Sequence, residues 1–113
     1  MKIVSGPISL DELRVTAEAI FGNMVKAVVD VDKELVALDA ELHSDLEAAL
    51  LEKEAQQKSL WGINIYPDMQ GDDFIEFDSM INMRPSQGNK SRGVESEPMR
   101  QRIVQVVAKR VKR

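Results

Sequence analysis

Residues 60–67 read Leu-Trp-Gly-Ile-Asn-Ile-Tyr-Pro, and this alternation of side-chain type predicts a β-strand. Successive side chains of a strand point to opposite faces, so the tryptophan and the two following isoleucines should share one buried face. The glycine, asparagine and tyrosine should share the other. Pro67 ends the strand, because proline cannot donate a ladder hydrogen bond. We therefore interpret Trp61 as a core residue.

The chain before this strand predicts a helix and a hairpin. Ser9 and Glu12 are spaced as a capping box, and the apolar residues that follow recur at helical spacing until Gly22, which indicates a helix over residues 10–21. Two runs rich in β-branched residues, 24–31 and 35–40, are separated by only three polar residues. Strands this close in sequence are expected to pair antiparallel. Residues 2–4 are a further short candidate strand.

The chain after residue 40 predicts four more elements. A short helix opens at residues 44–47, and the strand at 60–66 is followed by an alternating segment, 74–84, expected to pair with it. Residues 85–93 form a polar loop, and 97–112 form a helix with an apolar stripe and a basic end. In the alternating segment, one row is expected to face the helices: Ile75, Phe77, Ile81 and Met83. The opposite row holds the polar residues Glu76, Asp78, Asn82 and Arg84, together with Phe74 and Met80.

These elements predict an α+β fold. Their order is β-α-β-β-α-β-β-α, which gives a mostly antiparallel sheet with helices packed on one face. A length of 113 residues fits a single domain over 1–113. The core should form where Leu13, Ile20, Ile103 and Val107 meet the sheet.

Composition excludes several classes of protein. The chain has no cysteine, so it has no disulfide scaffold, no thiolate metal site and no cysteine nucleophile. No apolar run is long enough for a membrane span, and the first residues do not resemble a signal peptide. We therefore expect a cytoplasmic protein without a membrane partner.

Charge is distributed unevenly along the chain. Residues 1–83 hold 17 acidic and 6 basic residues, whereas residues 84–113 hold 2 acidic and 9 basic residues. The basic end can serve an anionic partner, or it can lie against the acidic body of its own chain or of a second copy.

The segment after the alternating strand is the strongest candidate for a ligand site. Glycines let backbone amides approach an anion, and arginine matches the geometry of phosphate or carboxylate. The residues expected to bind an anionic ligand or an acidic partner surface are Asn82, Arg84, Gln87, Asn89, Lys90 and Arg92. Arg84 and Arg92 should converge near the amides of Gly88 and Asn89, and Asp78 should hold one arginine in place. An alternative is a solvated loop that satisfies its own backbone.

His43, the only histidine, and Asp78 are the weak candidates for a catalytic residue. A histidine near carboxylates can act as a general base or bind a metal. However, a metal site needs three or four ligands, so we expect no metal and no cofactor. A histidine beside a helix start more often packs or caps, and we expect this structural role for His43.

The leading functional interpretation is a binding or interaction module without catalysis. One alternative is a small ribonuclease of toxin type, in which His43 or Asp78 acts as the base and Arg84 with Arg92 stabilises phosphate charge. Nucleic acid is possible but not favoured, because a pI near 5.0 is unusual for an RNA-binding enzyme. Another alternative is a homodimer in which the basic helix meets the acidic body of a second copy.

Three motifs resemble a known family. Residues 41–45 (ELHSD), 60–67 (LWGINIYP) and 81–89 (INMRPSQGN) together resemble a family of small, stand-alone bacterial proteins of unknown function. The resemblance covers nearly the whole chain and implies a bacterial source and a stand-alone domain. It implies no activity, so the functional interpretation depends on the residues described above.

Overall fold

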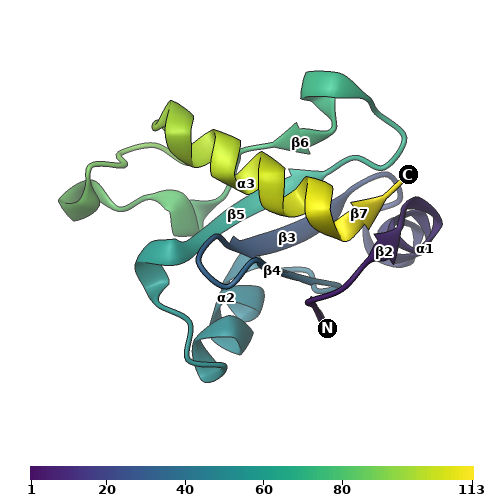
Figure 1. The fold of residues 1–113 in the computed structure, drawn as a ribbon, viewed down its shortest axis with the longest axis horizontal. Coiled ribbons are helices and arrows are strands. Elements are labelled where there is room, and N and C mark those ends of the chain that lie inside the picture. Colours follow the sequence, from purple (N-terminus) through teal and green to yellow (C-terminus); the bar gives the residue numbers. More distant parts are fainter.

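The predicted hairpin forms the centre of the sheet in the computed structural model, which describes residues 1–113 (Figure 1). The strands of the sheet are β1 (Lys2–Val4), β3 (Val25–Asp30), β4 (Leu35–Leu38), β5 (Leu60–Ile65) and β6 (Ile75–Glu76). Their spatial order is β1-β4-β3-β5-β6, and every neighbouring pair is antiparallel. The predicted α+β class with a mostly antiparallel sheet is confirmed.

Three α-helices accompany the sheet: α1 (Leu10–Ile20), α2 (His43–Glu52) and α3 (Glu97–Arg110). The predicted cap of α1 is present, because the Ser9 hydroxyl accepts the Glu12 amide at 3.1 Å. Ser96 caps α3 in the same way, accepting from Met99. None of these helices combines the length and apolar character needed to cross a membrane.

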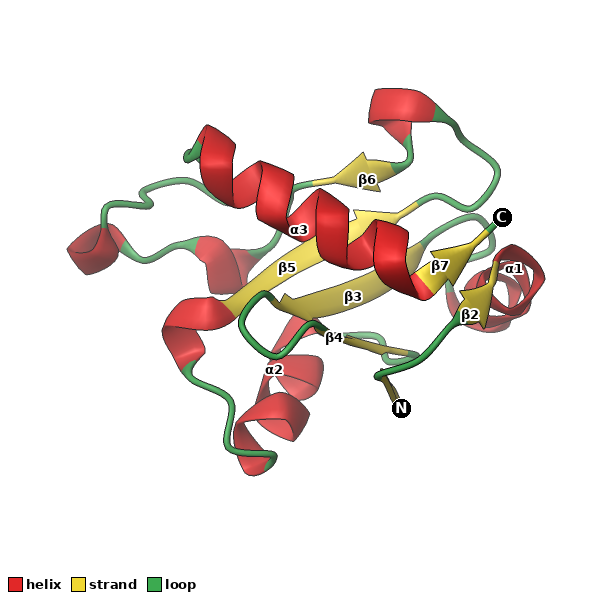
Figure 2. Cartoon of the chain, viewed as in Figure 1, coloured by secondary structure: helices red, strands yellow, loops and turns green.

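The helices cover both faces of the sheet rather than one. α1 and α3 pack on the face that carries Trp61, Ile63 and Ile65, and this side holds the larger core. α2 packs on the opposite face, where Leu46 and Leu50 contact a smaller cluster of sheet residues. Figure 2 shows α3 in front of β3 and β5, with α2 behind the sheet. The expectation of helices on one face therefore holds for α1 and α3 only, because Val28 and other buried strand residues also need cover on the second face.

A small parallel pair joins the two terminal segments. β2 (Ile8–Ser9) lies beside β7 (Val111–Lys112), with Ile8 opposite Val111. β7 follows α3 directly, so the pairing holds the end of α3 against the segment that precedes α1. The sequence analysis did not predict these strands, because two-residue strands leave no periodic pattern.

The basic helix lies against the acidic body of its own chain. Lys109 forms an ion pair with Glu34 at 2.7 Å, and Arg102 forms one with Asp32 at 3.1 Å. Both carboxylates belong to the turn between β3 and β4. Contact of the basic end with the acidic body of its own chain, one of the three arrangements that the charge distribution allowed, is present in the structure.

The alternating segment 74–84 is a further part of the fold that was predicted wrongly. The strand ends at Glu76, and residues 80–82 form a 3₁₀ turn capped by the Ser79 hydroxyl. Ile75 and Phe77 pack against the larger core as expected, but Ile81 packs against the smaller one and Met83 is exposed. Asn82, assigned to a wet face, is completely buried. The turn reverses which side chains point inward, so the predicted register fails beyond Phe77.

Candidate functional site

The side chain of Asn82 completes the edge of β5 where β6 is absent. Its Oδ1 accepts the Gly62 amide at 2.8 Å, and its Nδ2 donates to the Gly62 carbonyl at 2.9 Å. This is the pair of bonds that a neighbouring strand residue would make. The same Nδ2 also donates to the Arg92 carbonyl at 3.0 Å. A side-chain amide thus takes the place of a strand at this position.

Gly62 is required by the close approach of the turn. A Cβ atom at this position would lie 2.5 Å from both Cβ and Oγ of Ser79. Carbon atoms in contact are normally about 3.5–4.0 Å apart. Any side chain at position 62 would therefore push the 79–82 turn away from β5.

Asn89 organises the predicted anion-binding segment from within. Its Nδ2 donates to the carbonyls of Asn82 at 2.7 Å and Gly93 at 2.8 Å, and its Oδ1 accepts the Glu95 amide at 2.9 Å. Its backbone exchanges two hydrogen bonds with Arg84. The amide of Asn89 is thus used to close the loop on itself.

Arg84 is buried against Trp61 rather than presented to solvent. The guanidinium carbon lies 4.6 Å from the centre of the indole, and the group donates to the carbonyls of Leu60 and Ile81. Burial lowers the pKa of Arg84, and the nearby Glu47 carboxylate opposes this shift. Arg84 Nη1 and Glu47 Oε2 are both buried without a hydrogen-bond partner. Arg84 therefore anchors the loop to β5.

Arg92 and the exposed residues of the loop are placed separately from Arg84. Arg92 pairs with Asp78 at 2.6 Å, as expected for an acid that holds one arginine, whereas no contact joins Arg92 to Arg84. Lys90 and Gln87 are exposed. Anion binding by this segment stays a prediction, and its solvent-facing groups are Gln87, Lys90 and Arg92.

The loop already contains an anion, which belongs to its own chain. The Glu95 carboxylate accepts the amides of Lys90 at 2.6 Å and Ser91 at 2.9 Å. These bonds, with the Lys90 amide the largest cause, lower the pKa of Glu95. The Gly88 amide donates to the Pro85 carbonyl at 3.1 Å. The amides of Gly88 and Asn89, where a ligand was expected, thus donate to backbone carbonyls of the loop, and the next two amides bind Glu95.

His43 opens α2 and is buried beneath it. Its Nε2 lies 2.7 Å from the Ile63 carbonyl, so this nitrogen carries the hydrogen and the ring donates to β5. Burial lowers the pKa of His43, and the charges of Lys26 and Arg92 act in the same direction. The neutral ring therefore ties α2 to the sheet. As candidate catalytic residues, His43 and Asp78 each have a structural partner, and no group of three or more potential metal ligands is present.

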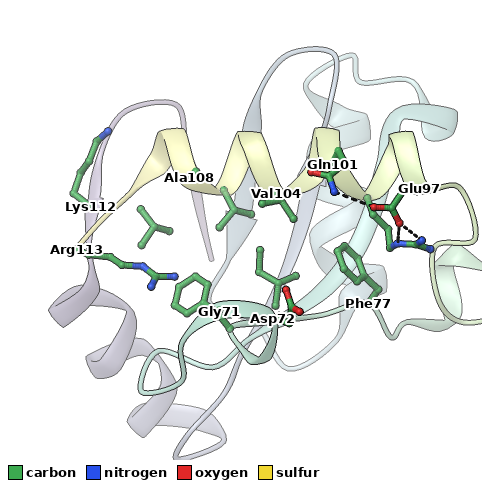
Figure 3. Close-up of a pocket in the computed structure, with 14 residues that line it drawn as sticks. Gly71, Asp72, Phe77, Glu97, Gln101, Val104, Ala108, Lys112 and Arg113 are labelled. Carbon is green, nitrogen blue, oxygen red and sulfur yellow. Dashed lines mark hydrogen bonds and ion pairs between the residues drawn. The ribbon is translucent and has the colours of Figure 1, made fainter.

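A large depression of the surface lies elsewhere, between α3 and the segment that carries β6. It is a groove of about 790 Å³ (Figure 3). Its apolar lining comes from Phe74, Ile75, Phe77, Val104, Val107, Ala108 and Val111. Val104 projects from α3 toward the groove with 40% of its surface exposed, and Ile75 and Phe77 are half-buried. The groove thus leaves apolar surface open to solvent.

The two ends of the groove differ in charge. At one end, Arg100 pairs with Glu97 within the first turns of α3, so the two charges compensate. At the other end, Lys112 and Arg113 have no carboxylate partner, and the Arg113 guanidinium lies 4.0 Å from the centre of the Phe74 ring. Figure 3 shows these ends on opposite sides of the apolar lining. The groove therefore joins a mostly apolar lining, in which Asp72 is the one acidic residue away from the Arg100–Glu97 end, to an end that carries two unpaired cations.

The sequence analysis did not identify this groove. It assigned Phe74 to the polar face of a strand and treated the apolar stripe of α3 only as core. Val104 lies beside that stripe, where an apolar residue widens the apolar face beyond what the core needs. This width is the one signal that could have indicated a second contact surface on α3.

Comparison with known proteins identifies a family and no further relative. A family model described as "Protein of unknown function (DUF5674)" matches residues 2–110. No curated protein matches the chain, and no solved structure does.

Proposed function

The chain belongs to the family described as Protein of unknown function (DUF5674), and from its geometry we propose that it is an interaction module that binds an apolar segment of a partner protein in the groove along α3. The single observation that carries this proposal is the apolar lining that remains open to solvent. Water-exposed apolar surface costs free energy, about 25 cal/mol per Å², which a partner recovers on binding.

The groove has the properties of a ligand site rather than of a packing defect. Its volume of about 790 Å³ lies within the range of sites that enclose small ligands or short peptides. Its lining combines aromatic and aliphatic side chains with a few charged groups at the ends, which is the usual composition of such sites. The loop of residues 78–95, in contrast, uses its polar groups mainly to hold its own chain.

The positive end specifies the chemistry of the partner. Arg113 contacts Phe74 and forms no ion pair, although Asp72 also lines the groove. An anionic group beside Arg113 would therefore gain a charge-assisted hydrogen bond. The partner that we propose is therefore still acidic, as expected from the sequence, but it binds at the end of the groove and not at residues 84–93.

A display experiment tests the proposal. A library of random dodecapeptides with free carboxyl ends is selected against the wild type, and the enriched peptides are then measured against Val104→Glu. This substitution places a charge in the lining without altering a buried residue. We expect enriched peptides that bind at least tenfold more weakly to this variant, since a desolvated carboxylate opposes an apolar ligand.

The matched control is Val15→Glu, on the outer face of α1 with 67% of Val15 exposed. It makes the same chemical change away from the groove and should leave peptide affinity unchanged. Failure to enrich any peptide, or equal binding to the wild type and the Val104→Glu variant, would remove the basis of the proposal.

A further inference from the structure

Resting on the proposed function, we propose that the partner segment binds as an extra β-strand, antiparallel to β6, with an acidic carboxyl end against Arg113. This inference concerns the mode of binding and the chemistry of the bound segment. It follows from the free edge of β6, the length of the groove and the position of its unpaired cations.

β6 is the last strand of the sheet and has one unpaired edge. The Tyr66 amide donates to the Phe74 carbonyl at 2.9 Å, and Asn64 lies opposite Glu76 in the register with β5. Backbone groups of alternate residues point to opposite sides of an antiparallel strand. The N–H and C=O of Ile75 therefore point away from β5, toward the side on which a further strand would bind.

This free edge borders the groove. Ile75 belongs to β6 and lines the groove together with Phe74 and Phe77, which flank the strand. An extended segment bonded to Ile75 would place alternate side chains over the apolar lining, opposite Val104. Strand addition supplies affinity through main-chain bonds, and pockets for alternate side chains supply specificity.

The groove is long enough for a short strand. It follows α3 from Glu97 to Ala108. Eleven helical steps of about 1.5 Å give roughly 16 Å. Extended residues advance about 3.3 Å each, so about five residues span this distance.

The direction of the strand follows from the charges. The segment from Phe74 to Phe77 runs from the Arg113 end of the groove to the Glu97 end (Figure 3). An antiparallel partner therefore has its carboxyl end beside Arg113 and Lys112, the cations without a carboxylate partner. A terminal carboxylate or a final aspartate complements this end, whereas the compensated Arg100–Glu97 pair offers nothing to a charged amino end.

Two N-methylated versions of the most enriched peptide test the strand mode. One carries methyl groups on the odd-numbered backbone nitrogens and the other on the even-numbered ones. A bound strand uses only one edge, so one version should lose at least tenfold in affinity while the other binds as the parent does. Equal loss in both, or no loss in either, contradicts strand addition. If the peptides still depend on Val104, the proposed function stands while this inference falls.

Hydrogen exchange and a charge reversal test the register and the direction. Binding of the parent peptide should slow exchange of the Ile75 amide at least tenfold. Arg113→Glu should weaken a peptide ending in aspartate at least fivefold, and replacement of that aspartate by lysine should restore binding. Lys58→Glu, an equal charge change at an exposed position of the 57–59 turn, is the control and should have no effect. Unchanged exchange at Ile75, or equal effects of the two substitutions, refutes the model.

Discussion

Replacing Gly62 with alanine should destabilise the protein by forcing the 79–82 turn away from β5. The new Cβ would lie 2.5 Å from both Cβ and Oγ of Ser79, which requires a shift of about 1 Å. Overpacking of this kind costs about 1–3 kcal/mol. The shift also weakens the two hydrogen bonds between Asn82 and Gly62, each contributing roughly 1 kcal/mol. We expect a total loss of about 3 kcal/mol.

A double-mutant cycle isolates the contact. Ser79→Gly alone should cost about 1 kcal/mol through the lost bond to the Ile81 amide and the added backbone freedom. In the Gly62→Ala/Ser79→Gly variant both clashing Ser79 atoms are gone, and the closest remaining atom is Ile81 Cγ1 at 3.2 Å. The stability of this variant should therefore be close to that of Ser79→Gly. The coupling energy should reach about 2 kcal/mol or more.

Urea denaturation followed by circular dichroism measures all four members of the cycle. Thermal melting provides a second readout, in which a loss of 3 kcal/mol lowers the midpoint by roughly 10–15 °C in a domain of this size. Additive effects, with a coupling energy below about 0.5 kcal/mol, would show that the approach of the turn to Gly62 does not constrain the fold.

Three further predictions concern the loop and α2. Burial holds the pKa of folded His43 below its ordinary value of 6.5, so the contribution of His43 to stability is complete above that pH and is lost as pH falls through the folded pKa. His43→Gln should therefore make the urea midpoint depend less on pH between about pH 7 and 5, and parallel pH profiles of the two proteins would contradict this. Asn89→Ala should cost about 2–4 kcal/mol, since it leaves buried carbonyls unpaired, whereas Gln87→Ala should stay within about 0.5 kcal/mol of the wild type by urea denaturation. If residues 84–93 bind anions, phosphate or short RNA at millimolar concentration should shift the NMR signals of the amides around Lys90 and Arg92. The Lys90→Ala/Arg92→Ala variant should show no such shifts, and wild-type spectra that no anion changes would contradict the prediction.

The sequence predicted those parts of the fold whose pattern depends on backbone periodicity alone. α1 has both its cap and its apolar spacing in the sequence, and β5 has strict alternation, so both were located within a residue or so. The second covered face of the sheet was missed because β5 presents Gly62 and Asn64 there, which suggest a wet face. Val28 and its apolar neighbours in β3 indicated instead that both faces of the sheet are covered, since consecutive apolar residues are typical of a strand that is buried on both sides.

The candidate sites were harder to predict, because the same residue types bind ligands and close loops. Asn82, Arg84 and Asn89 were selected for their hydrogen-bonding capacity, and the structure directs that capacity to carbonyl and amide groups of β5 and of the loop itself. Which acceptor an amide meets depends on tertiary contacts that a local pattern does not contain. The groove depends on the distance between α3 and β6, which are separated by the whole loop.

The role of Asn82 beside Gly62 has a genetic consequence. A hydrogen-bond ladder between two backbones tolerates almost any change of side chain, because every residue except proline offers the same donor and acceptor. Where a side chain makes one pair of these hydrogen bonds, the pair is lost whenever that one residue is replaced by another that cannot form it. Aspartate lacks the donor, serine is too short to present both groups, and glutamine displaces the amide by one carbon. In a saturation library selected for folded protein, position 82 should therefore accept almost no substitution, whereas exposed Met83 next to it should accept many.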